Sequence, residues 1–442
     1  MILSRLMSVV LVLTLLFAAP VRAGISLLRD ADIEYGLKQL AAPILTAAGL
    51  SSSQVRLLVV NDSSLNAFVV DTRHIFIHSG LIMKLDSAAA LQAVIAHEAA
   101  HIANGHITRR LGNLRTARTA AGLGMLLAAA AGAASSEGRA AAAIALGSQN
   151  SAKRIFLAHT RAEESSADIA SVRYLKRAGI DPKGAVEVQE LFRGQEALST
   201  SRQDPYVRSH PLSRDRLRAL KGLVAANPGG KRDPNAEYWF ARMRGKLTAF
   251  KRAPSWTLRR AGSSASKDIA LMRQAVAHHR SPNAKKAIRD INAALALRPN
   301  DPYLMELKGQ ILLESRNFDQ AVAVYRNAAN RAPREPLITG GLGRALLAAN
   351  RPKEALKALE TARGRDFFNA GLLRDLSVAY AKTGQPALAS LATAERFALR
   401  GRWKDAELHA KRAADRLPRG SSPWQRAQDV LHAAKQSQRK RR

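Results

Sequence analysis

The residues best suited to chemistry lie in the stretch Ile95–His101, which contains two histidines and a glutamate in the order HExxH. On a helix, His97 and His101 are four residues apart, so both imidazoles leave one face about one turn apart. This spacing lets two ring nitrogens bind one tetrahedral Zn²⁺. Glu98 is placed to take a proton from a metal-activated water without binding the metal. The pattern predicts a catalytic site with one Zn²⁺ per chain; two buried structural histidines are the alternative.

A catalytic zinc site needs a third protein ligand. Downstream, a helix predicted from Thr160 to Ala178 carries Glu164 and Asp168, again four residues apart. One carboxylate would bind the metal, and the other would accept a hydrogen bond from the free N–H of a ligand histidine. We favour Glu164 as the ligand and Asp168 as the acceptor. Glu163 is the competing ligand, but it projects about 100° away and would break this pairing.

These motifs resemble those of a known family. HExxH followed by a helix bearing ExxxD is similar to the gluzincin arrangement. The stretches 94–101 (VIAHEAAH) and 160–168 (TRAEESSAD) resemble the metallopeptidase family that includes the CAAX prenyl proteases and the HtpX heat-shock protease. The resemblance implies a zinc metalloendopeptidase of gluzincin type.

Two further stretches match this family. Asn66, Ala67 and Phe68 resemble its strand ahead of the metal helix, where we expect the substrate backbone to bind by β-augmentation. Ser209-His210-Pro211-Leu212, followed by Arg214 and Arg216, resembles its downstream SHP element. The resemblance implies that His210 approaches the zinc and holds the enzyme closed. A second catalytic role for His210 is donation to the tetrahedral oxyanion, and a plain turn histidine is the alternative.

Short strands and a helix must position these residues. We predict strands at Val55–Asn61, Ala67–Val70 and His74–His78, because they are rich in β-branched and aromatic residues. The pattern turns helical from Ser87 to about Arg110. On that helix His106 lies about 140° from His101, so we predict that it is structural and does not share the metal.

Beyond residue 268 the chain repeats itself every 34 residues, as alanines 287, 321, 355 and 389 show. Each unit predicts two short amphipathic helices, and the block resembles a tetratricopeptide-repeat array; an unrelated helical bundle is the alternative. The last unit is out of phase, because only 17 residues separate Ala389 from Ala406. We therefore predict a mainly α chain: an α+β gluzincin-type zinc peptidase domain followed by an α-helical tetratricopeptide-repeat array. The predicted divisions are a signal peptide (1–23), the peptidase domain (24–230), a helical connector (231–267), the repeats (268–420) and a basic C-terminal tail (421–442).

The N-terminus predicts the compartment. Arg5 precedes the uncharged apolar stretch Leu6–Ala18, and Val21-Arg22-Ala23 forms a small-residue cleavage site, which together are typical of a secretory signal peptide. Cleavage after Ala23 would leave 419 residues, located in the periplasm if the source is a Gram-negative bacterium. An uncleaved anchor is the alternative, although a span needs about 20 apolar residues. The uncharged Ala/Gly-rich segment 119–136 predicts a helical flap or an interfacial segment rather than a span.

Composition narrows the partners. The 442 residues include 69 Lys and Arg, 35 Asp and Glu, and no Cys, which excludes thiol catalysis and Cys-ligated metals. The net charge of +34 favours an anionic membrane surface or lipopolysaccharide as a partner. Nucleic acid is disfavoured, because 5% aromatic residues leave few stacking platforms and the signal directs the chain out of the cytoplasm.

The whole arrangement resembles exported peptidases that degrade stalled outer-membrane β-barrel proteins and assist their assembly. That resemblance implies misfolded outer-membrane proteins as substrates and docking of the repeats on the barrel-assembly machinery. Two other functions stay open. One is a periplasmic chaperone or scaffold with latent proteolysis, and the other is a peptidase tethered to the inner membrane by its N-terminus or by segment 119–136.

Overall fold

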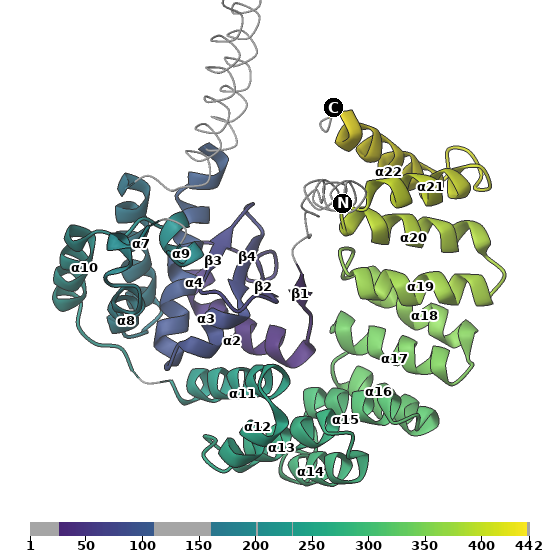
Figure 1. The fold of residues 1–442 in the computed structure, drawn as a ribbon, viewed down its shortest axis with the longest axis horizontal. Coiled ribbons are helices and arrows are strands. Elements are labelled where there is room, and N and C mark those ends of the chain that lie inside the picture. The colour runs from purple at the N-terminus through teal and green to yellow at the C-terminus, as the bar shows by residue number, and fades with distance from the viewer. Residues whose placement is uncertain (1–25, 110–160, 200–201, 232, 440–442) are drawn as a thin grey trace, which may run out of the picture. The chain divides into compact units, whose positions relative to one another are not determined.

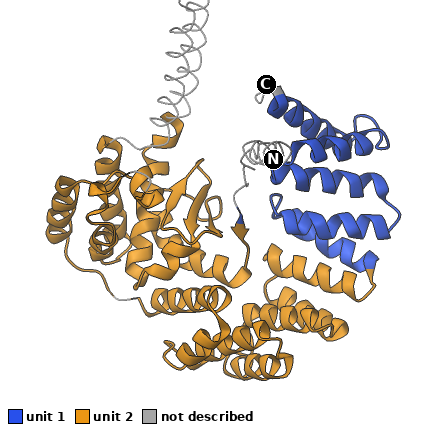
Figure 2. Ribbon diagram, viewed as in Figure 1, with its two compact units in different colours: residues 1–26, 352–442 blue, residues 27–351 orange. Residues whose placement is uncertain are grey.

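The computed structural model describes residues 26–109, 161–199, 202–231 and 233–439. Two compact units contain residues 27–351 and 352–442 (Figure 2). The prediction of a mainly α chain with a small α+β part is confirmed. The predicted signal peptide and the segment 119–136 lie outside the described residues. Within the described ranges, none of the helices has both the length and the apolar character needed to cross a membrane.

The N-terminal part of the first unit holds the strands of the described residues together with several helices (Figure 1). Its strands are β1 (Leu27–Leu28), β2 (Arg56–Val60), β3 (Ala67–Val69) and β4 (His74–His78). Its helices are α2 (Ala31–Ala47), α3 (Ser79–Lys84), α4 (Ala88–Ala103), α7 (Arg161–Arg177), α8 (Lys183–Leu191), the 3₁₀ turn η1 (Gln195–Ala197), α9 (Pro205–Ser209) and α10 (Arg214–Ala226).

In the rest of both units, the described residues form helices and no strands. The first unit continues with α11 (Pro234–Lys251), α12 (Pro254–Ala261), α13 (Lys267–Arg280), α14 (Ala284–Leu297), α15 (Pro302–Glu314), α16 (Phe318–Arg331) and α17 (Pro336–Ala348). The second unit contains α18 (Pro352–Arg363), α19 (Ala370–Lys382), α20 (Pro386–Leu399), α21 (Trp403–Ala414) and α22 (Ser422–Arg439).

The strands form one sheet in the order β1-β2-β4-β3. β2 and β4 are parallel, whereas β1 runs antiparallel to β2, and β3 runs antiparallel to β4. The three predicted strands are present, with ends one residue shorter in two of them. The two residues of β1 are too few to form a sequence pattern. In the strand order of the described residues, β3 lies at one edge of the sheet, because it pairs only with β4.

Alternate side chains of the strands point to opposite faces of the sheet. On one face they join α2 and α4 in the main hydrophobic core: Leu57, Val59, Ile75 and Ile77. On the other face they form a small apolar cluster: Leu58, Val60 and Phe76. The helix with the HExxH motif therefore packs against the sheet rather than lying at the surface.

α4 begins where its sequence predicts and ends earlier than expected. The Ser87 side chain accepts a hydrogen bond from the backbone N–H of Ala90, which caps the first turn. The continuous helix predicted to about Arg110 is wrong, because the chain turns at Asn104-Gly105, where Gly105 has a φ of +68°. The chain resumes a helical conformation at His106.

The predicted repeats are pairs of short helices, and small residues lie where the helices cross. A Cβ on Gly309 of α15 would lie 2.7 Å from the Tyr325 ring of α16, which explains why glycine stands there. The segment predicted as a basic C-terminal tail, 421–442, is helical over most of its described length. It contains α22, which packs on α20 and α21 and buries Ala427 and Ala434.

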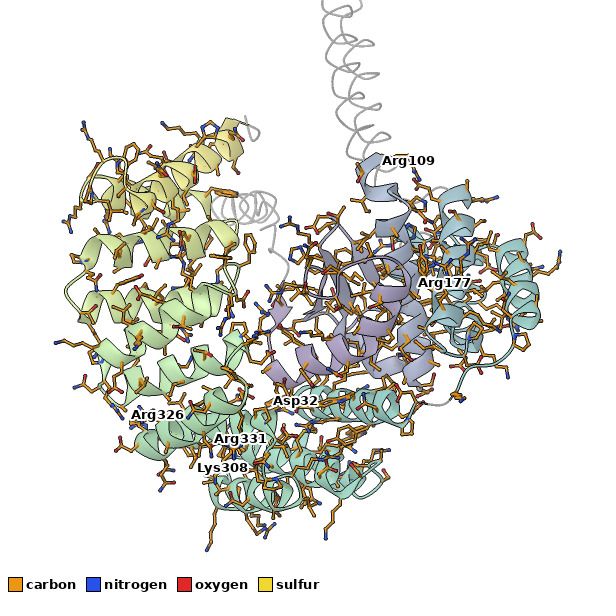
Figure 3. The ribbon with its side chains drawn as sticks, turned by 180° about the vertical axis from the view of Figure 1, so that it is seen from behind. Asp32, Arg109, Arg177, Lys308, Arg326 and Arg331 are labelled. Carbon is orange, nitrogen blue, oxygen red and sulfur yellow. The ribbon has the colours of Figure 1, made fainter. Side chains whose placement is uncertain are left out.

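Two buried cations of α11 join the sheet domain to the repeats. The Arg242 guanidinium lies 2.9 Å from the Asp32 carboxylate of α2 and also binds Asp301 at the start of α15. The Lys246 Nζ lies 2.9 Å from Asp30, 3.7 Å from Asp32 and 3.6 Å from Glu306 of α15. Asp32, labelled in Figure 3, is fully buried. The connector predicted at 231–267 contains α11 and α12, and this ion network fixes the first of them in place.

Replacing Lys246 with Met removes the cation that three buried or half-buried carboxylates share. We expect Lys246→Met to lower the free energy of unfolding of the first unit by about 3–5 kcal/mol, because uncompensated buried charges are costly. Lys251→Met changes an exposed lysine of the same helix and is expected to cost no more than about 0.5 kcal/mol. Urea denaturation followed by circular dichroism measures both, and equal midpoints would contradict the role of this network.

Candidate metal centre

α4 presents its two histidines on one buried face. The Nε2 atoms of His97 and His101 lie 3.1 Å apart. His101 is fully buried and His97 is 6% exposed. Two neutral imidazoles cannot both direct lone pairs at one another across this distance without a proton or a cation between them. The arrangement suits two nitrogens that bind the same cation.

α7 packs along α4 and brings its acidic pair to the same place (Figure 1). Glu164 is fully buried, with Oε2 3.4 Å from the Nε2 of His97 and Oε1 3.5 Å from the Nε2 of His101. Glu163 is partly exposed and lies outside this group. Of the two glutamates that the sequence left in competition, the structure brings Glu164 to the histidines.

These distances match the geometry of a tetrahedral metal ion. Donors held about 2.05 Å from such an ion lie about 3.3 Å from one another. The Nε2 atoms of His97 and His101 lie 3.1 Å apart, and they lie 3.4 and 3.5 Å from Oε2 and Oε1 of Glu164 respectively, so each pair of residues offers two donors at about that spacing. Two imidazoles and one carboxylate also form a donor set of catalytic zinc sites. The residues present therefore fit a bound metal.

A second ring of contacts orients the two histidines. The Nδ1 of His97 lies 3.2 Å from Oδ1 of Asp168, the residue that the sequence predicts for this contact. The Nδ1 of His101 forms a 2.9 Å hydrogen bond with the Nδ1 of His106. When the Nε2 atoms bind a metal, both Nδ1 atoms carry the proton and donate it outward.

The contact of His106 with His101 corrects the sequence analysis. We predicted that His106 lies about 140° from His101 on one continuous helix, and the turn at Gly105 breaks that helix. The Asn-Gly pair at 104–105 is the signal that would have predicted the turn. His106 does not belong to the cluster of metal-ligating atoms, as predicted, but it contacts one of them directly.

Arg216 of α10 binds both acidic residues of α7. Its Nε and one terminal nitrogen donate to the two Asp168 oxygens at 2.8 and 3.0 Å, and the other terminal nitrogen lies 3.0 Å from Oε2 of Glu164. The guanidinium is itself buried, at 7% exposure. The sequence analysis noted Arg216 only as part of a family motif, and its role in holding two carboxylates was missed.

His210 lies over the remaining side of the cluster. Its Nδ1 is 3.1 Å from Oε1 of Glu164, and its Nε2 is 3.3 Å from Oε1 of Glu98 and 3.3 Å from the carbonyl oxygen of Ala67. Its ring stacks on Tyr206 at a centroid distance of 4.6 Å. His210 is itself buried, at 1% exposure.

The strand predicted to bind substrate lies next to His210. Asn66 is buried immediately before β3, and Ser209 Oγ donates to its side-chain oxygen at 3.4 Å. Ala67 is fully buried and Phe68 is half-buried on β3. The structure therefore brings the predicted strand and the predicted metal ligands together, and α9 packs beside that strand.

Burial and the neighbouring charges shift the pKa values of the clustered side chains. Burial lowers the pKa of His97, but Asp168 and Glu164 outweigh it and raise that pKa to about 9. Burial and the neighbouring His97 hold the pKa of His101 well below its ordinary value. Burial raises the pKa of Glu164, yet His210 and His97 hold it well below its ordinary value. The carboxylates are therefore ionised and favour a cation among them.

Comparisons with known proteins agree with this geometry. Residues 28–224 match peptidase family M48, and residues 307–370 match a tetratricopeptide repeat. The chain is 24% identical over 348 residues to the beta-barrel assembly-enhancing protease of Yersinia pestis. The aligned region covers 78% of this chain and 71% of that protein. The protein of the same name from Escherichia coli K12 is 22% identical over 416 residues, or 92% and 83% of the two chains. The mitochondrial metalloendopeptidase OMA1 of Schizosaccharomyces pombe is 25% identical over 182 residues, or 40% and 49%. The resemblance inferred from the motifs is confirmed.

Removing the guanidinium of Arg216 leaves Asp168 and Glu164 without their fixed donor. We expect Arg216→Gln to weaken metal affinity about 10- to 100-fold, because the carboxylates that orient and bind lose their positions. Arg218→Gln, on the same helix and with an 82% exposed side chain, is the matched control and should bind metal as the wild type does. Competition with a chelator, followed by elemental analysis, measures the affinity. Equal affinities in the two variants would exclude the role of Arg216.

Proposed function

We propose that this chain, whose residues 28–224 belong to peptidase family M48, is a zinc endopeptidase that acts in the quality control and assembly of outer-membrane β-barrel proteins. The observation that carries the enzymatic part is the set of 3.1–3.5 Å separations among the His97, His101 and Glu164 donors beside the buried Glu98. The remainder of the proposal rests on the repeats and on the named relatives.

The side chains divide the work of hydrolysis. His97, His101 and Glu164 would hold the ion, and a bound zinc supplies Lewis-acid activation of a water and of the scissile carbonyl. Glu98 takes the proton of that water and passes it to the leaving amine. Oε2 of Glu98 has no hydrogen-bond partner within the described residues, whereas Oε1 faces the Nε2 of His210 at 3.3 Å.

His210 controls access in this proposal. It lies against Glu98, Glu164 and the carbonyl of Ala67, so it occupies the space that the reacting peptide needs. Substrate entry requires the segment around α9 to move away from β3. Donation of a ring N–H to the oxyanion is the alternative role of His210, and removing the ring would then lower the rate rather than raise it.

β3 offers the substrate a backbone template. It lies at an edge of the sheet among the described residues, and the Ala67 carbonyl points to His210 rather than to another strand. An extended peptide that adds to this edge would replace the contact with His210 and lie across the metal. Asn66, Ala67 and Phe68 are the residues that we assign to substrate binding.

The compartment and partners follow from the sequence and the relatives. The signal peptide supports export to the periplasm, and two relatives are named for beta-barrel assembly. The tetratricopeptide repeats are the part of the chain that we assign to docking on the barrel-assembly machinery, with misfolded outer-membrane proteins as substrates. The net charge of +34 supports a peripheral association with an anionic membrane surface and no role in binding nucleic acid.

The first test removes the base and the metal separately. We expect Glu98→Gln to lower the rate of peptide hydrolysis by at least about 100-fold while the protein keeps one zinc per chain, because the amide cannot take a proton. A chelator should abolish the wild-type activity and added Zn²⁺ should restore it. Cleavage of an unfolded protein substrate, read by electrophoresis, measures both.

The same variant separates the enzyme from a scaffold. If Glu98→Gln fails to support outer-membrane assembly in cells, proteolysis carries the function. If it supports assembly fully, the repeats act as a chaperone or scaffold and proteolysis is latent. Zinc content equal to that of the wild type is the control for folding.

Removing the ring of His210 tests closure. We expect His210→Ala to raise hydrolysis of a short fluorogenic peptide several-fold, because the side chain that covers Glu98 and the strand edge is gone. Arg208→Ala changes an exposed residue of α9 and should leave the rate unchanged. Lower activity in His210→Ala would contradict closure and indicate that His210 acts in catalysis.

A further inference from the structure

A cavity among the connector helices is lined by residues other than those of the metal centre. It has a volume of about 410 Å³ and lies among α11, α12, α13 and the turn between α12 and α13, with Met83 and Asp86 of the sheet domain at one side. None of the predicted metal or substrate residues lines it. The proposed function assigns no role to this cavity.

Arg273 of α13 is a buried cation in this cavity. Its side chain is 8% exposed, and one terminal nitrogen donates to the Arg260 carbonyl at 3.1 Å and to Ser264 Oγ at 2.6 Å. Its Nε–H has no acceptor within the described residues, and no carboxylate of those residues forms an ion pair with it. Burial and the nearby Arg244 lower its pKa. A buried guanidinium with a free donor is costly unless an anion completes its contacts.

Further guanidinium groups converge on the same space. Arg244 and Arg252 line the cavity. The guanidiniums of Arg252 and Arg260 lie over the Trp256 ring, 5.9 and 4.7 Å from its centroid. Such stacking leaves the N–H edges of an arginine free to bind an anion. The cavity is therefore rich in donors that prefer oxygen anions.

The acidic residues of the cavity do not neutralise it. Asp86 forms a 3.0 Å ion pair with Arg244, but its side chain is 90% exposed. Glu237 also lines the cavity and forms no ion pair within the described part of the chain. Two carboxylates thus face three lining arginines, and the most buried of these, Arg273, has neither carboxylate as a partner.

The backbone of α11 makes room for Arg273. A Cβ on Gly245 would lie 3.1 Å from Cδ of Arg273 and 3.3 Å from Cγ2 of Ile269. The glycine lets α11 and α13 approach closely, so the arginine stem lies along α11 and its guanidinium remains in the cavity. The position of the buried cation is therefore built into the packing of the two helices.

We propose that this cavity binds an oxyanion of the phosphate class, held by Arg273 from within and by Arg252 and Arg244 at the rim. Several guanidiniums bind a phosphate better than a carboxylate, because a phosphate offers more acceptor oxygens in more directions. The phosphate comes either free from solution or from a phospholipid headgroup, and the two sources share this chemistry. The site would join the connector helices to the sheet domain through one ligand.

The experiment measures binding to the full exported chain in chloride buffer at constant ionic strength. Calorimetric titration with inorganic phosphate is the first arm. Cosedimentation with phosphatidylcholine vesicles, with and without phosphatidylglycerol, is the second arm. Each is done with the wild type, Arg273→Gln, Arg252→Gln and the control Arg259→Gln, which removes an exposed arginine of α12 that does not line the cavity.

We expect one site per chain, weakened at least about tenfold by Arg273→Gln and changed less than about twofold by Arg259→Gln. Loss of phosphate binding assigns the ligand to solution, and an Arg273-dependent loss that occurs only with phosphatidylglycerol vesicles assigns it to a headgroup. Arg252 is exposed, so Arg252→Gln decides the question if Arg273→Gln does not fold. The proposal is wrong if neither probe binds, if the arginine variants bind as the wild type does, or if Arg259→Gln loses as much affinity.

Discussion

The arrangement of the metal centre depends on the contacts of one buried guanidinium, that of Arg216, with two carboxylates. Glu164 is fully buried and Asp168 is 7% exposed, so the cluster concentrates negative charge away from water. Such charges are stable inside a protein only when opposite charges and hydrogen bonds meet them. Arg216 supplies that charge to Asp168 and Glu164 from a helix 48 residues further along the chain. It therefore fixes α7 against α10 and aims Glu164 at the histidines of α4.

The same cluster gives the physical basis for the closure proposed above. His210 contacts the proposed base, the proposed third ligand and the backbone of the edge strand at once. In the proposed function a peptide substrate would need the same space, so substrate and His210 would compete for one volume. The contacts of Asp168 with Arg216 and His97, and the contact of His101 with His106, do not involve His210. The site can thus be complete and inaccessible at the same time.

Buried ion pairs also determine how the sheet domain continues into the repeats. Arg242 and Lys246 of α11 meet acids from α2 and from the start of α15, three elements that are distant in sequence. Charged contacts of this kind are specific in direction, whereas an apolar face tolerates sliding. The connector is therefore a structural part of the first unit, and two of its arginines, Arg244 and Arg252, line the cavity proposed to bind an oxyanion.

The amino-acid sequence alone determined the parts of the site that lie within one helical turn. His97, Glu98 and His101, and separately Glu164 and Asp168, follow from the period of the α-helix, which relates spacing to direction without any knowledge of the fold. Only the tertiary structure decided that Arg216 joins the acids, that His106 returns to His101 after a break at Gly105, and that α22 packs where a tail was predicted. The spacing of these residues along the sequence does not show how close their side chains lie in the folded protein. Those contacts exist because burial of apolar faces brings α4, α7 and α10 together, and the side chains at their junctions must then satisfy one another's charge.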